Sequence, residues 1–226
     1  MIPIGDHNWR RSVPTATILL VLANIAVFAY QSLLPPQTRE QFLRQAAMIP
    51  QDLVGSPSVA VAGTLLTSMF LHDGFLHIAG NMLYLGIFGD NVEERMGTLG
   101  FLTFYVAGGI GAGLAHVITH PLSSTPTVGA SGAIAAVLGA YLALFPTNRV
   151  RTLLILGWFV RFAELPAFLV LGMWFVLQLV NGVLSLGVEA SGGVAWFAHL
   201  GGFVFGLVIG GLLRHRRPTR PFQRNW

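Results

Sequence analysis

The chain has 226 residues, of which 54% are hydrophobic and only 10% carry a charge. Soluble domains have about 25% charged residues, and the apolar residues here lie in long stretches, so the composition excludes an ordinary soluble enzyme and predicts a membrane protein. The net charge of +4 comes from thirteen arginines and no lysine. The absence of cysteine excludes disulfides, zinc–thiolate sites and cysteine nucleophiles.

Six apolar stretches follow one another along the chain, and we expect each to form a membrane helix. The first begins after a basic patch but continues to Leu34 without a small-residue cleavage site, so we interpret it as a span rather than a signal peptide. Several stretches are shorter than the ~20 residues of a full span, which suits helices that begin at a water-filled cavity. The sequence predicts an all-α, polytopic bundle forming a single domain over residues 1–226, with spans near 17–33, 75–90, 98–117, 130–145, 166–184 and 194–213.

The arginines are distributed unequally between the two sides of this bundle. With six spans, the side that holds both termini carries eleven arginines, and the other side carries only Arg39 and Arg44. The positive-inside rule then predicts cytoplasmic termini, in a cell (inner) membrane since no organelle transit signal is evident. The basic tail is interpreted as an anchor near anionic lipid, with no nucleic-acid partner. Residues 149–161, apolar between arginines, are expected to lie at the interface or to extend the fifth helix.

Four polar side chains within the spans are candidates for function: Ser131, His199, and the pair His77 and Asn81, which share a helix face. Polar groups are costly in a bilayer and are usually functional there, although a helix cap, a buried hydrogen bond or an interhelical contact would also explain each one. Ser131, His199 and His77 each lie thirteen or fourteen residues from the cytoplasmic end of their span, about 20 Å at 1.5 Å per residue. This common level favours one shared site.

Small residues in the fourth and sixth spans predict that these two helices pack closely. Gly202 and Gly206 repeat at a spacing of four after His199, and Gly132 and Gly139 lie in the fourth span. Such stripes let membrane helices approach backbone to backbone, which would bring Ser131 within reach of His199. A serine hydroxyl needs a neighbouring base of this kind to act as a nucleophile.

Four motifs in this order resemble the rhomboid family of intramembrane serine proteases across essentially the whole chain: HIAGN at 77–81 with the preceding TSMFLHDGFLH, VEERMG at 92–97, GASG at 129–132 and AHLGGFVFG at 198–206. The resemblance implies that Ser131 is the nucleophile and His199 the general base and later acid. It implies an oxyanion hole made by His77, Asn81 and the backbone N–H of Ser131.

The resemblance also implies several structural roles. Glu93 and Arg95 would form an ionic pair, residues 35–70 would form a large loop partly in the outer leaflet, and residues 186–194 would cap the active site. Two positions depart from the family pattern: the first loop has no tryptophan for a Trp–Arg pair, and Ala135 replaces an aromatic residue that stacks on the catalytic histidine.

Other catalytic arrangements fail because their residues are missing. No His-Glu-x-x-His helix exists for a zinc protease, Asp90 has no second membrane aspartate, and no carboxylate lies inside a span to complete a triad. We expect no cofactor and no metal; His116 and His120 are interpreted as interfacial. The substrates would be transmembrane proteins cut near the outer end of a span, at helix-weakening residues. The alternative is a catalytically inactive rhomboid-like factor that binds membrane proteins.

Overall fold

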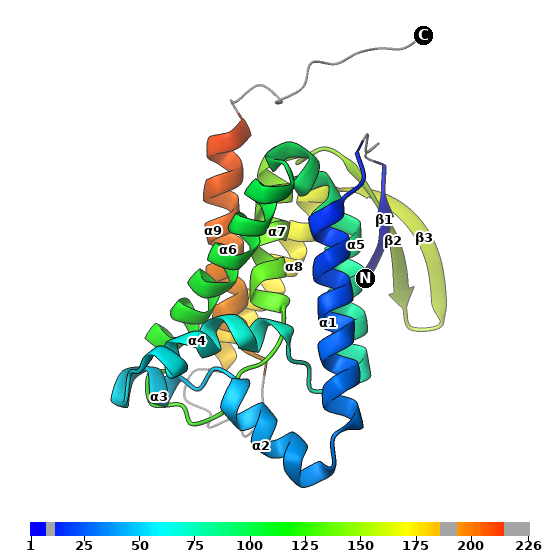
Figure 1. Cartoon of the computed structure of the whole chain (residues 1–226). Helices are drawn as coiled ribbons and strands as arrows, with labels where there is room; N and C mark the ends of the chain where they lie inside the picture. The colour runs from blue at the N-terminus through cyan, green and yellow to red at the C-terminus, as the bar shows by residue number, and fades with distance from the viewer. Residues whose placement is uncertain (8–11, 186–193, 215–226) are drawn as a thin grey trace.

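The protein, described by a computed structural model over residues 1–7, 12–185 and 194–214, consists mainly of helices that run along one direction (Figure 1). Each predicted span contains one helix, with bounds that differ from the prediction by a few residues. These helices are α1 (Thr15–Leu33), α5 (Phe75–Met96), α6 (Thr98–Thr119), α7 (Ser131–Leu144), α8 (Ala167–Leu184) and α9 (Trp196–Arg214).

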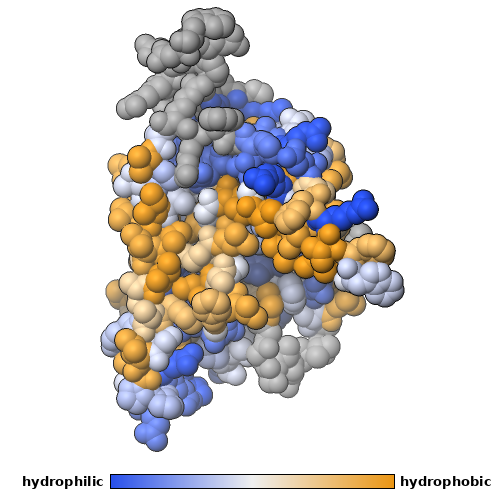
Figure 2. All heavy atoms as spheres, turned by 90° about the vertical axis from the view of Figure 1, so that its right-hand side faces the viewer, coloured by the Kyte–Doolittle hydropathy of each residue, from blue (hydrophilic) through white to orange (hydrophobic). Residues whose placement is uncertain are grey.

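The protein is a polytopic membrane protein. Helices α1, α6, α8 and α9 are long and apolar enough to cross a bilayer. A fifth span is formed if the helical segment Val59–Phe70 and α5, bent by 82° at their junction, count together. On the face shown in Figure 2, apolar side chains form a band across the middle of the molecule, between hydrophilic regions above and below. The predicted number of six spans is not confirmed, because α7 has only 14 residues, about 21 Å of helix.

Helix α7 lies at the centre of the bundle. Nine of its fourteen residues are buried, and a helix enclosed by protein need not span the bilayer by itself. It packs against α9 without intervening side chains: a methyl group on Gly206 would collide with the carbonyl oxygen of Ala136, and one on Gly139 with that of Phe203. The close approach predicted from the glycines is therefore confirmed.

Residues 35–70 form four short helices at the end of the bundle opposite the C-terminal end of α9: α2 (Pro36–Ala46), α3 (Pro50–Gly55), α4 (Val59–Thr67) and the 3₁₀ helix η1 (Ser68–Phe70) (Figure 1). Proline at the first position of α2 and α3 suits a helix start, since no N–H is needed there. Met48 and Thr127 exchange two backbone hydrogen bonds of 3.1 and 2.8 Å. The loop thereby supports the segment that leads into Ser131.

A three-stranded antiparallel sheet was not predicted. The strand order is β1 (Ile2–Asp6), β2 (Arg149–Leu156) and β3 (Phe159–Pro166). Strands β2 and β3 form a β-hairpin, whereas residues 149–161 were expected to lie at the interface or to extend the fifth helix. Val150 and Thr152 are buried while the arginines beside them alternate outward, the two-residue period of a strand. Gly157, with φ +62°, makes the turn between β2 and β3.

The expected ionic pair of Glu93 and Arg95 is wrong. Residues two apart on a helix point in different directions, and each side chain binds the end of another helix. The carboxylate of Glu93 accepts hydrogen bonds from the backbone N–H groups of Ala16 and Thr17 at 2.9 and 2.8 Å, so it caps α1. Arg95 donates to the carbonyl oxygen of Leu213 near the end of α9, at 3.1 Å.

Candidate active site

Ser131 is the first residue of α7 and does not cap it. The N-cap position is Ala130, and no side-chain capping bond is present. Gly129 precedes it with φ +125°, and a methyl group there would lie 2.8 Å from Nε2 of His77. Glycine at this position therefore permits both the turn into α7 and the close approach of the His77 ring.

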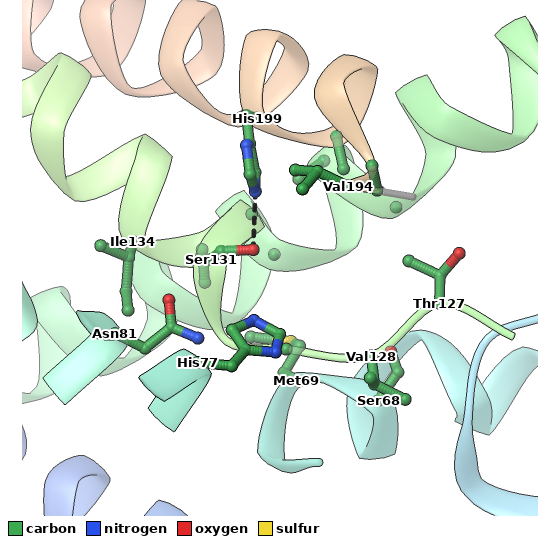
Figure 3. Close-up of a pocket in the computed structure, with 18 of the residues that line it drawn as sticks. Ser68, Met69, His77, Asn81, Thr127, Val128, Ser131, Ile134, Val194 and His199 are labelled. Carbon is green, nitrogen blue, oxygen red and sulfur yellow. Dashed lines mark hydrogen bonds between the residues drawn. The ribbon is translucent and has the colours of Figure 1, made fainter. Parts of the chain in front are cut away.

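The hydroxyl of Ser131 faces His199 across the α7–α9 contact. Its Oγ lies 2.7 Å from Nε2 of His199 (Figure 3). The other ring nitrogen, Nδ1, lies 2.7 Å from Oε1 of Gln178 on α8, and a carbonyl oxygen can only accept a hydrogen bond. The Nδ1 atom therefore carries the proton, and the lone pair of Nε2 faces the serine.

His77 and Asn81 lie on the other side of Ser131 from His199 in the view of Figure 3, and both line the same cavity. The amide nitrogen of Asn81 is buried and has no hydrogen-bond partner within the described residues. Nδ1 of His77 lies 2.5 Å from a carboxylate oxygen of Asp73. Since Nδ1 donates to that carboxylate, Nε2 of His77 can donate only when the ring is doubly protonated, whereas Asn81 can donate in every state.

A cavity of about 700 Å³ contains these four side chains. Its wall comes from α5, α6, α7, α8 and α9 together with residues 125–129 and the region of η1. Such a volume can hold water and a short extended peptide. Over the described ranges, 1–7, 12–185 and 194–214, no group of three or more His, Cys, Asp or Glu side chains could hold a metal ion.

Sequence reasoning missed the side chains that hold the predicted ones in place. Trp174 and Trp196 flank His199 with ring centroids 5.9 and 6.3 Å away, so they supply the aromatic contacts that Ala135 cannot. Gln178 could have been found by the same rule that selected Ser131, since it is a polar residue in an apolar span. The expected cap at 186–194 lies outside the described residues, except for Val194.

Comparison with known proteins identifies the family. A family model described as Rhomboid domain matches residues 61–216, more than half of the chain. The chain belongs to the rhomboid family. A rhomboid relative from Arabidopsis thaliana, RHOMBOID-like protein 5, is 33% identical over 149 residues, which cover 66% of this chain and 43% of the relative.

Two further rhomboid relatives align over more of the chain. RHOMBOID-like protein 12, mitochondrial, from Arabidopsis thaliana is 27% identical over 94% of this chain and 63% of its own length. Rhomboid protease GluP from Bacillus subtilis is 28% identical over 88% of this chain and 34% of its own length. This rhomboid chain therefore spans between about a third and two thirds of the relatives that it matches.

Proposed function

We propose that this protein is an intramembrane serine endopeptidase that cleaves transmembrane segments of other membrane proteins with a dyad of Ser131 and His199. The observation that carries the proposal is the 2.7 Å separation of Ser131 Oγ and His199 Nε2 inside a cavity of the bundle. A serine at a helix start usually caps that helix, but here its hydroxyl faces a base. Membership of the rhomboid family, and the name of the relative GluP, agree with this chemistry.

In the proposed reaction, Ser131 Oγ attacks the carbonyl carbon of the scissile bond while Nε2 of His199 takes the hydroxyl proton. The C–N bond then breaks as His199 returns that proton to the leaving nitrogen, and a water molecule activated by His199 hydrolyses the acyl-enzyme. No carboxylate in the described part of the chain hydrogen bonds to His199; its ring partners there are Ser131 and Gln178.

The negative charge of the tetrahedral intermediate would be stabilised by three groups. Asn81 brings an amide donor without a partner in the described part of the chain, His77 a ring nitrogen whose opposite nitrogen is held by Asp73, and Ser131 its backbone N–H. That N–H is among the first four of α7, which have no partner within the helix, and the positive end of the helix dipole points the same way. In the low-dielectric interior of the bundle, these donors stabilise a negative charge more strongly than they would in water.

Substrates would enter as transmembrane helices from the lipid bilayer. A helix hides its scissile amide in intrachain hydrogen bonds, so a segment with Gly, Pro or another weak helix former would unwind into the cavity at the least cost. The cavity lining includes Met48 and Leu65, from the region of α2 to α4, and we infer that cleavage occurs near the outer face.

We infer further that the protein is a single domain in the inner membrane of a cell. Both termini would face the cytoplasm. Helix α2, which carries Arg39 and Arg44, lies at the end of the bundle opposite the C-terminal end of α9 (Figure 1). This separation agrees with the positive-inside rule. A reporter enzyme active only in the cytoplasm, fused after residue 226, should be active; activity of a periplasmic reporter there would reverse the topology.

The proposal is tested by reconstituting the protein in liposomes with a transmembrane substrate that carries a Gly-rich outer segment. The wild-type chain should produce a cleaved fragment, and Ser131→Ala, which keeps the fold, should produce none. Binding of the substrate without cleavage by the wild type would instead support the inactive, membrane-protein-binding alternative. Cleavage that persists in Ser131→Ala would exclude the serine mechanism.

A further inference from the structure

The second ring nitrogen of His199 is bound by an uncharged partner. Oε1 of Gln178 lies 2.7 Å from Nδ1 of His199, and both side chains are buried, with 8% and 9% of their surfaces exposed. No residue type other than glutamine or asparagine offers a neutral side-chain carbonyl at this position. Gln178 therefore occupies the place at Nδ1 that an aspartate has in a serine–histidine–aspartate triad, without the negative charge.

The position of Gln178 on α8 removes its amide from water, which is unfavourable for a polar group. The buried residues of α8 form one stripe along the helix, while most of its other large side chains are exposed. A polar amide on such a stripe loses its water and needs a hydrogen bond in return. Among the described residues its one hydrogen-bond partner is His199. A leucine would pack there without this requirement, so the amide needs an explanation other than packing.

The chemistry of a neutral imidazole explains why an amide lies next to His199. The ring carries a single proton, and if this proton were on Nε2 it would point at Ser131 and leave no base to accept the hydroxyl proton. An acceptor at Nδ1 holds the proton on that side and leaves the lone pair at Nε2. The two tautomers thus differ completely in their ability to activate Ser131.

We propose that Gln178 is a positioning residue that holds His199 in its base-competent tautomer and orients its ring towards Ser131. The inference rests on the proposed function of the Ser131–His199 pair and extends it to a third side chain. A neutral amide suits this buried site because a carboxylate would have to give up its hydration. The amide also remains an acceptor when His199 is doubly protonated during the reaction.

Two substitutions of Gln178 and one matched control test this role. Gln178→Met keeps the length of the side chain but removes the carbonyl acceptor, and Gln178→Glu keeps an acceptor. Asn181→Met, three residues further along α8, replaces an amide whose hydrogen bond goes to the carbonyl oxygen of Leu177. Each variant is compared for kcat, KM, the rate of labelling by a serine-reactive fluorophosphonate and the midpoint of thermal unfolding.

We expect Gln178→Met to lower kcat and the labelling rate by about 10- to 100-fold, the effect of losing one buried hydrogen-bond partner. Its KM should stay within about twofold. Gln178→Glu should retain most of the activity per folded molecule but unfold at a lower temperature, because its carboxylate loses its hydration in the folded protein. Asn181→Met should behave as the wild type. Wild-type kcat in Gln178→Met, or a loss equal to the loss of folded protein, would overturn the proposal.

A spectroscopic measurement keeps this inference separate from the proposed function. Protonated and unprotonated ring nitrogens of histidine have well-separated 15N NMR shifts, and the His199 signals are identified by their absence in His199→Ala. The wild type should have a protonated Nδ1 and an unprotonated Nε2 on His199, and Gln178→Met a mixture of tautomers. If the wild type neither cleaves nor labels, the proposed function fails while this result still tests Gln178. An unprotonated Nδ1 in the wild type would overturn the inference alone.

Discussion

Gly206 is the position where a small perturbation far from the chemistry should have the largest effect on it. It lies seven residues, or two helical turns, after His199 on α9. The Cβ atom of an alanine at this position would overlap the carbonyl oxygen of Ala136 on α7, and the carbonyl carbon and Cα of Ala136 would lie only 2.6 and 2.8 Å away. Backbone atoms cannot rotate aside, so the two helices must separate.

The distances at this contact set the size of the expected helix shift, and with it the losses of stability and reactivity. Non-bonded carbon atoms prefer separations of about 3.5–4.0 Å, so α9 must shift from α7 by about 1 Å in Gly206→Ala. Overpacking of this kind costs about 1–3 kcal/mol of stability. A displacement of about 1 Å at a reacting group can lower the rate by about 10²-fold, and we expect that loss in fluorophosphonate labelling of Ser131.

Gly211 provides the matched control on the same helix. An added Cβ there meets no atom within 4 Å, so Gly211→Ala should label at the wild-type rate and unfold at the same or a slightly higher temperature, since alanine favours helix over glycine by about 1 kcal/mol. Thermal unfolding in detergent and labelling rates are measured on the same preparations. If Gly206→Ala is as stable and as reactive as Gly211→Ala, the backbone contact between α7 and α9 does not exist.

Two further predictions concern the oxyanion donors and the cap of α1. Asn81→Ala should lower kcat by about 10²–10³-fold with little change in KM, as expected for loss of one oxyanion donor; His77→Ala should lower it less, because its Nε2 donates only from the doubly protonated ring. A normal kcat per folded Asn81→Ala molecule would remove Asn81 from the site. Glu93→Gln should destabilise the protein by about 1.5–3 kcal/mol, since two backbone N–H groups of α1 lose a charged acceptor. The control is Glu40→Gln, which removes the exposed ion pair with Arg44 and should lower the stability by only about 0.3–0.5 kcal/mol. If Glu93→Gln and Glu40→Gln lower the stability equally, Glu93 does not cap α1.

The proximity of Ser131 and His199 could be predicted because polar side chains are rare within membrane-spanning stretches. Ser131 and His199 lie in otherwise apolar stretches, and the glycines of α7 and α9 indicate which helices meet. The same rule would also select Gln178 as a polar residue in an apolar span, but it would not assign Gln178 to the site. Its role depends on the direction in which α8 presents it, which spacing along one helix does not reveal.

The errors in the fold have a similar origin. Residues 149–161 were judged by their overall hydrophobicity between arginines, although Val150 and Thr152 alternate with outward arginines in the period of a strand. Pairing with β1, which lies almost 150 residues earlier, is a long-range contact that no local pattern encodes. The pair of Glu93 and Arg95 was expected from the resemblance to the rhomboid family, but the directions of the two side chains on α5 place them at the ends of different helices.

The most direct test of the dyad is the site of covalent labelling by a fluorophosphonate, mapped by mass spectrometry of the purified protein in detergent. The wild-type chain should carry one adduct, on Ser131, and His199→Ala at most a trace of it at equal protein concentration and equal folded fraction. An adduct on a different serine, or labelling of Ser131 that proceeds at the wild-type rate without His199, would contradict the dyad.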